Sequence, residues 1–196
     1  MTNSEKFYDR LTFLYPIIDL FLRSQKRKLF REINDSAFGQ LLDIGAGNGS
    51  HFKYYNTHEI TAIDTSRGML AQARKHLRSN IQLVQMNGEK LLFPSQVFDY
   101  VILSHVIAVV EDPEKLLEEV YRVLKPNGKV FILNHFTPDN WLKYLDKTFE
   151  IISKLVFFKS MFQISNVRNI EKFKLLMEIN AGLSSYFKIL IYEKKA

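Results

Sequence analysis

The sequence contains no cysteine among its 196 residues. Disulfide bonds, thiolate-bound metals and cysteine nucleophiles are therefore excluded by composition alone. Long hydrophobic runs are missing as well, because no stretch approaches the ~18 apolar residues that would span a bilayer. The first residues, 1–6, also lack the basic start and apolar core of a secretory signal. We therefore expect a cytoplasmic protein.

Repeats, linkers and low-complexity segments are absent too, which leaves no place for a domain boundary. With 46% hydrophobic and 24% charged residues, the chain has the composition of an ordered globular protein. We predict a single domain over residues 1–196. It should contain amphipathic helices in 1–37, an α/β core in 38–136, and lid helices with a last strand in 137–196.

Acidic residues are fewer than basic ones, 21 against 27, so the net charge is +6. Such a charge favours an anionic partner, for example a phospholipid surface, although it is also compatible with an ordinary solvated surface. Five basic residues fall within 23–31, next to the apolar positions of a helical pattern. This helix could lie on anionic headgroups, or it could simply cover the rest of the fold.

Short apolar runs alternate with amphipathic stretches through the middle of the chain. The pattern predicts strands at 41–44, 60–63, 81–85, 100–103 and 129–133, and helices at 69–77 and 113–124. This alternation is typical of a Rossmann-like, doubly wound α/β fold with a mostly parallel sheet and helices on both faces. We expect two short helices around Pro16 as an N-terminal flap. A helical lid at 139–158 and 167–179, and a strand at 186–192, should follow the core.

A glycine-rich turn at 43–49 directly follows the first predicted strand. Glycines allow the backbone to turn tightly and a ligand to approach the main chain closely. The spacing G-x-G-x-G after an acidic residue differs from that of dinucleotide sites, and suits a cofactor with a cationic amino-acid end. Asp64 closes the second strand, fifteen residues after Gly49. A carboxylate at that place can accept hydrogen bonds from both hydroxyls of a ribose.

Five motifs in order resemble those of class I S-adenosylmethionine-dependent methyltransferases; they lie at 43–49, 64–70, 87–94, 98–99 and 122–128. The resemblance implies S-adenosylmethionine as cofactor and S-adenosylhomocysteine as product. It implies a glycine loop behind the methionine part, an aspartate on the ribose, and the turn at 87–89 against the adenine. The cofactor-binding residues implied in this way are Asp43, Gly45, Ala46, Gly47, Asp64, Thr65, Met69, Asn87, Gly88, Glu89 and Ser104.

Asn87 departs from the pattern, because many relatives carry an aspartate there that accepts a hydrogen bond from the adenine amine. We expect the side-chain carbonyl of Asn87 to accept the same bond without a charge, with retained but weaker binding.

A narrower resemblance connects the chain with the short bacterial phosphatidylethanolamine N-methyltransferases, through 8–10, 15–16, 52–55, 104–113 and 134–136. It implies a peripheral enzyme at the inner face of the membrane that methylates a lipid amine up to three times. Only one strand is predicted after residue 180, where the fold commonly has two. The alternatives are a C- or O-methyltransferase of a quinone or another small apolar molecule, and a membrane-associated binding protein without turnover.

Methyl transfer from a sulfonium is an in-line displacement, so alignment of the acceptor can supply much of the rate. A nearby acceptor must also hold the proton of the amine, and aromatic faces suit a quaternary ammonium product. The catalytic candidates are Tyr8, Tyr15, His105 and His135, of which His135 is the preferred polar contact of the substrate. The sequence has neither metal-ligand spacing nor a nucleic-acid motif. We expect a monomer that binds a phospholipid substrate and an anionic membrane, and no metal or nucleic acid.

Overall fold

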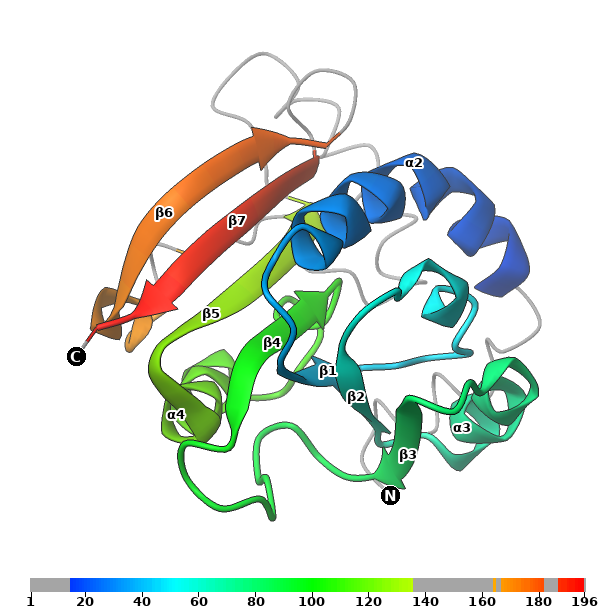
Figure 1. The fold of residues 1–196 in the computed structure, drawn as a ribbon, viewed down its shortest axis with the longest axis horizontal. Coiled ribbons are helices and arrows are strands. Elements are labelled where there is room, and N and C mark those ends of the chain that lie inside the picture. Colours follow the sequence, from blue (N-terminus) through cyan, green and yellow to red (C-terminus); the bar gives the residue numbers. More distant parts are fainter. Residues whose placement is uncertain (1–14, 136–163, 165–166, 182–186, 196) are drawn as a thin grey trace.

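The computed structural model describes residues 15–135, 164, 167–181 and 187–195 (Figure 1). Within these ranges, seven strands form one open sheet in the order β3-β2-β1-β4-β5-β7-β6. The parallel strands are β1 (Gln40–Ile44), β2 (Glu59–Asp64), β3 (Ile81–Gln85), β4 (Phe98–Ser104) and β5 (Leu124–His135). Antiparallel β7 (Phe187–Lys194) lies between β5 and β6 (Phe173–Asn180).

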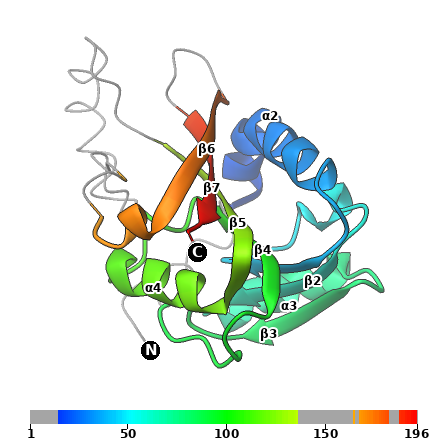
Figure 2. The same cartoon turned by 60° about the vertical axis from the view of Figure 1, so that its left-hand side comes forward.

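Helices cover both faces of this sheet, as Figure 2 shows for α2 (Tyr15–Asn34) and α4 (Pro113–Val123). α3 (Arg67–Ala73) continues into a short 3₁₀ helix, Arg74–His76, and Phe52–Tyr54 forms another. One apolar layer packs under α2 and contains its fully buried Leu29 and Ile33. The other packs under α4 and contains its Leu116 and Val120. The predicted doubly wound, mostly parallel fold with helices on both faces is confirmed.

The predicted strands and helices of the core correspond to β1–β5, α3 and α4. Local signals explain where these helices begin. The Asp112 carboxylate accepts the N–H of Lys115 at the start of α4, and Pro113 takes the first helical position, where no N–H is needed. The Ser66 hydroxyl accepts the N–H of Met69 in the same way and starts α3.

The helix predicted at 167–179 is wrong. This segment forms a 3₁₀ turn, Ile170–Lys172, and then the edge strand β6. A bulge shifts the register of β6 between Leu175 and Met177, so the alternation of inward and outward residues that marks a strand is interrupted. The described part of the chain therefore has two strands after β5, as this fold commonly has, although only one was predicted. The other predicted lid helix, 139–158, lies outside the described residues.

Of the two helices predicted around Pro16, the second corresponds to α2, which begins at Tyr15 and runs to Asn34. Pro16 is the second residue of α2, a position in the first turn that tolerates proline because no intrahelical N–H bond is lost. Residues 1–14 lie outside the described part of the chain, so an earlier helix there is still only a prediction.

Candidate functional site

A cavity opens where β1, β2, β3 and β4 end, at the carboxyl edge of the parallel sheet. In open α/β sheets, ligands bind at this edge where the strand order reverses, which here is between β1 and β4. Ten of the predicted site residues line the cavity: Gly45, Gly47, Asp64, Thr65, Met69, Asn87, Gly88, Glu89, Ser104 and His105. Thus four separate loops bring their predicted residues to one place.

The glycine loop forms the floor of the cavity beside the end of β1. Gly45, Gly47 and Gly49 all have positive φ angles, of 80°, 55° and 70°, which L side chains adopt at a cost. A Cβ atom on Gly45 would overlap Cγ2 of Val106, which also lines the cavity. Gly45 therefore needs to be glycine for two reasons, its backbone conformation and the close approach of the β4 loop.

Asp64 connects the end of β2 with this loop. Its Oδ2 accepts the N–H of Gly47 at 2.8 Å, and its Oδ1 accepts the N–H of Ser66 at 2.9 Å. Burial raises the pKa of Asp64 above its ordinary value, although the N–H groups of Ser66 and Gly47 act in the opposite direction. The carboxylate is thus held rigidly, with its oxygens in a wall of the cavity, where they can accept hydroxyl groups.

Asp43 and Ala46, which were also predicted to bind the cofactor, are buried and do not line the cavity. The Asp43 carboxylate lies 2.7 Å from Nε2 of His51. Burial first, and then the charge of Asp43, raise the pKa of Tyr55 well above its ordinary value. The sequence indicated no role for His51 or Tyr55. The structure places both behind the glycine loop, so Asp43 supports that loop from within.

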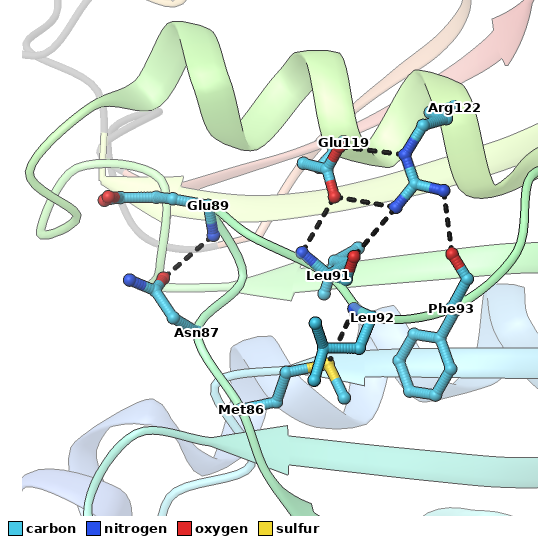
Figure 3. A network of polar contacts seen from close by, with 8 residues as sticks. All are labelled: Met86, Asn87, Glu89, Leu91, Leu92, Phe93, Glu119 and Arg122. Carbon is cyan, nitrogen blue, oxygen red and sulfur yellow. Dashed lines mark hydrogen bonds and ion pairs between the residues drawn. The ribbon is translucent and has the colours of Figure 1, made fainter.

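The turn after β3 forms the wall that was predicted to meet the adenine (Figure 3). The side-chain oxygen of Asn87 accepts the N–H of Glu89 at 2.8 Å. The Glu89 carboxylate in turn accepts the N–H groups of Glu111 and Asp112, at 2.7 and 3.0 Å. Glu89 therefore ties this turn to the loop before α4 and closes one end of the cavity.

An ion pair on α4 holds the same turn from the other side (Figure 3). Arg122 contacts Glu119 at 2.7 Å and donates to the carbonyl oxygens of Phe93 and Leu91, at 2.7 and 3.0 Å. Glu119 also accepts the N–H of Leu91, and its hydrogen bond with Arg122 lowers the pKa of Glu119. The arginine that opens the fifth sequence motif thus positions the turn at residues 87–93.

The structure describes the four catalytic candidates to different extents. His105 lines the cavity directly after β4, with a φ of 60°, and its ring packs edge-on against Phe187 at 5.9 Å. Left-handed backbone at a non-glycine residue is stored strain and is found preferentially at functional sites. His135 ends β5, beside Phe187 of β7, and Tyr15 begins α2, but their side chains are outside the described structure. Tyr8 lies outside the described residues altogether.

Asn134 is a residue whose environment the sequence could not show. Its side chain is only 1% exposed, and neither of its amide atoms has a hydrogen-bond partner within the described part of the chain. The buried hydroxyl of Ser104, on the neighbouring strand, is in the same situation. Unpaired buried polar groups cost about 1–3 kcal/mol each, so they call for an explanation. Both stand near the carboxyl ends of the paired strands β4 and β5, and Ser104 lines the cavity.

The basic segment 23–31 is divided by the packing of α2. Lys26 is buried, and Lys28 donates to the carbonyl oxygen of Asn180 at 3.1 Å, which ties the helix to β6. Arg27 and Arg31 are exposed, on the side away from the buried Leu29. Part of this segment therefore covers the sheet, and part is available to a partner.

None of the helices in the described ranges combines the length and the hydropathy of a membrane-spanning segment. The same residues contain no cluster of three or more histidines and carboxylates that could hold a metal ion.

Known proteins that are similar to this chain are methyltransferases. Residues 42–132 match the methyltransferase domain. A phosphatidylethanolamine N-methyltransferase of Cereibacter sphaeroides is 28% identical over 179 residues, which make up 88% of this chain and 88% of that protein. A ubiquinone/menaquinone biosynthesis C-methyltransferase of Psychromonas ingrahamii is 32% identical over 129 residues. That match covers 59% of this chain and 51% of the relative, so the chain spans about half the length of the quinone enzyme.

Solved structures agree with the fold. An S-adenosylmethionine-dependent methyltransferase of Thermotoga maritima superposes with a TM-score of 0.76 at 20% identity, over 97% of this chain and 99% of the other. The matched domain begins in β1 and ends in β5, and it therefore contains every loop that lines the cavity.

Proposed function

We propose that this chain, which is an S-adenosylmethionine-dependent methyltransferase, transfers methyl groups to the amine of phosphatidylethanolamine and of its mono- and dimethyl forms. One observation supports this acceptor above others. The similarity to the phosphatidylethanolamine N-methyltransferase extends over 88% of both chains, whereas the similarity to the quinone enzyme covers about half of each. The first match is therefore long enough to include most of the segments outside the cofactor core, which select the acceptor in such a fold.

In the proposed complex, the cofactor lies across the ends of β1, β2 and β4. The ribose hydroxyls donate to the carboxylate of Asp64, the adenine lies beside Asn87 and Gly88, and the methionine part follows the loop of Gly45 and Gly47. Each of these residues lines the cavity. S-adenosylmethionine supplies the activated methyl group, and the protein supplies alignment, because an in-line displacement needs no covalent intermediate with the enzyme.

The acceptor amine reaches the cavity from the ends of β4 and β5 in this proposal. Ser104 and His105 line the cavity there, and His135 ends the adjacent strand. The amine must have a free lone pair to attack, so a neutral imidazole can take its proton, while a hydroxyl can accept a hydrogen bond that orients it. Tyr8 and Tyr15 are proposed to contribute aromatic faces that stabilise the cationic product.

A quinone or another small apolar acceptor is the second candidate. The observation that favours it is the 32% identity to the quinone C-methyltransferase, which exceeds the identity to the lipid enzyme. That match is concentrated on a shorter part of the chain, and a shared cofactor core explains it equally well.

Lipid analysis of cells that express the chain separates these candidates. We expect mono-, di- and trimethylated ethanolamine lipids to accumulate, measured by mass spectrometry, and to be absent from cells that express Asp64→Ala. Unchanged ethanolamine lipids together with a newly methylated quinone would exclude the lipid proposal and favour the alternative.

We expect the purified protein to bind anionic vesicles through Arg27 and Arg31, two exposed cations of α2. Each basic residue near an anionic surface contributes about 1 kcal/mol, so Arg27→Gln with Arg31→Gln should weaken binding by about tenfold or more. Binding should also fall with salt, because charges are screened over ~10 Å at 0.1 M. Vesicle sedimentation measures both effects.

The matched control changes Arg74 and Lys75 to glutamine, which removes the same charge from two exposed residues of the 3₁₀ helix after α3. This control should bind as the wild type does. Equal losses in both double variants would mean that net charge alone, and not α2, attracts the vesicle.

A further inference from the structure

The side chain of Asn87 indicates how the protein binds the adenine base of the cofactor. Many of the methyltransferases that this chain resembles have an aspartate at this position, which accepts a hydrogen bond from the exocyclic amine of adenine. The side-chain oxygen of Asn87 was expected to accept the same bond. The structure gives that oxygen another partner, because it accepts the main-chain N–H of Glu89 at 2.8 Å. This bond also fixes which end of the amide is oxygen, since only an oxygen can accept from an N–H.

The surroundings keep the turn, and with it this bond, in place. The N–H of Lys90 donates to the main-chain oxygen of Asn87 at 3.1 Å. The Glu89 carboxylate is bound to the loop before α4, and Arg122 holds the carbonyl oxygens of Leu91 and Phe93. A flip of the amide would set its nitrogen against the N–H of Glu89 and leave two donors facing each other.

Figure 3 shows the amide nitrogen of Asn87 on the side away from the main-chain nitrogen of Glu89. Asn87 is exposed and lines the cavity, whereas Gly88 is buried beneath it, since a Cβ there would lie 2.7 Å from Ile44. An aspartate in the same conformation would place its second oxygen where this nitrogen lies. The substitution therefore replaces an acceptor by a donor at one point of the cavity wall.

We propose that Asn87 presents an N–H donor to the base edge of the cofactor, so that this chain gains no affinity from the exocyclic amine of adenine. An amide N–H cannot pair with an amine that is itself a donor, but it can donate to a ring nitrogen. The chain should therefore tolerate a purine that lacks the amine. The inference rests on the proposed placement of the adenine and is independent of the acceptor.

Two neutral probes test this by calorimetry, namely S-adenosylhomocysteine and its analogue with unsubstituted purine in place of adenine. The wild type should bind the two probes with affinities within about threefold. Asn87→Asp should bind S-adenosylhomocysteine about tenfold more tightly than the wild type, because a charged acceptor then meets the amine, and it should show no such gain on the purine analogue. A thermal melt verifies that the variant is folded.

Several results would overturn the inference. The first is a wild type that prefers S-adenosylhomocysteine by tenfold, because its amide would then already accept from the amine. The second is a gain in Asn87→Asp that is equal on both probes, because it would report charge alone. The third is that both probes bind Asn87→Asp as they bind the wild type, while Asp64→Ala loses affinity. In that case Asn87 does not present a donor to the base, and the proposed placement of the cofactor is retained. If Asp64→Ala also binds normally, the proposed placement of the cofactor itself is wrong.

Discussion

Replacing Asp64 with alanine is expected to weaken the binding of S-adenosylhomocysteine by about 100-fold or more. Two hydrogen bonds from ribose hydroxyls to a carboxylate would be lost, and bonds to charged groups contribute about 1.5–3 kcal/mol each. The same carboxylate also accepts the N–H groups of Gly47 and Ser66. The variant therefore loses both the contacts with the ribose and the support of the glycine loop. Isothermal calorimetry measures the change.

Asp99→Ala is the matched control for this variant. Asp99 also accepts a main-chain N–H, from Gln40 at 2.8 Å, and it pairs with Lys125, but it lies outside the cavity. Its loss should cost some stability and leave the affinity for S-adenosylhomocysteine within about twofold of the wild type. Equal losses of affinity in the two variants would show that the ribose does not lie on Asp64.

The raised pKa of Asp64 gives the same prediction a pH dependence. The ionised carboxylate accepts from both hydroxyls, whereas the protonated acid loses one acceptor. Affinity should therefore be full above the raised pKa and should fall as the pH decreases through it. Since burial raises this pKa, the loss should begin at a higher pH than for an ordinary aspartate. Affinity that stays constant in mildly acidic buffer would argue against a buried carboxylate as the ribose acceptor.

Replacing Gly45 with alanine should destabilise the protein and close the cavity. The new methyl group would overlap Val106 Cγ2, and the residue would keep a φ of 80°. Valine is stiff at χ1, so the β4 loop must move to make room. Overpacking and a left-handed side chain together cost about 3 kcal/mol, which corresponds to a decrease of about 6–12 °C in the melting temperature. Calorimetric melting curves and S-adenosylhomocysteine titrations measure both consequences.

Adding Val106→Ala to this variant separates its two causes. The smaller side chain removes the overlap and leaves only the backbone strain, so part of the lost stability should return. A single variant Gly45→Ala that melts with the wild type would contradict the close approach of the two loops.

The fold of the core could be predicted because buried parallel strands have a simple signature. Leu41, Leu42 and Ile44 are fully or nearly fully buried in β1, and such runs are apolar on both faces. β6 could not be predicted, because its bulge at Leu175 and Met177 removes the alternation, and its edge position leaves most of its residues exposed. The apolar residues Val167, Ile170, Phe173 and Met177 instead recur at the three- and four-residue spacing of a helical face.

The cofactor cavity could be located because its residues are consecutive in short loops that directly follow strands. What each polar atom does there could not be predicted, because this depends on contacts across the fold. Asp43 pairs with His51, and the Asn87 oxygen binds Glu89. The buried amide of Asn134, which has no hydrogen-bond partner among the described residues, likewise depends on packing that composition and spacing do not report.

A crystal structure of the protein with S-adenosylhomocysteine tests the central claim most directly. The account predicts that the ribose hydroxyls lie within hydrogen-bond distance of the Asp64 carboxylate, with the homocysteine part along Gly45 and Gly47 and the base beside Asn87. A ligand that is bound elsewhere, or one whose ribose has no contact with Asp64, would contradict it.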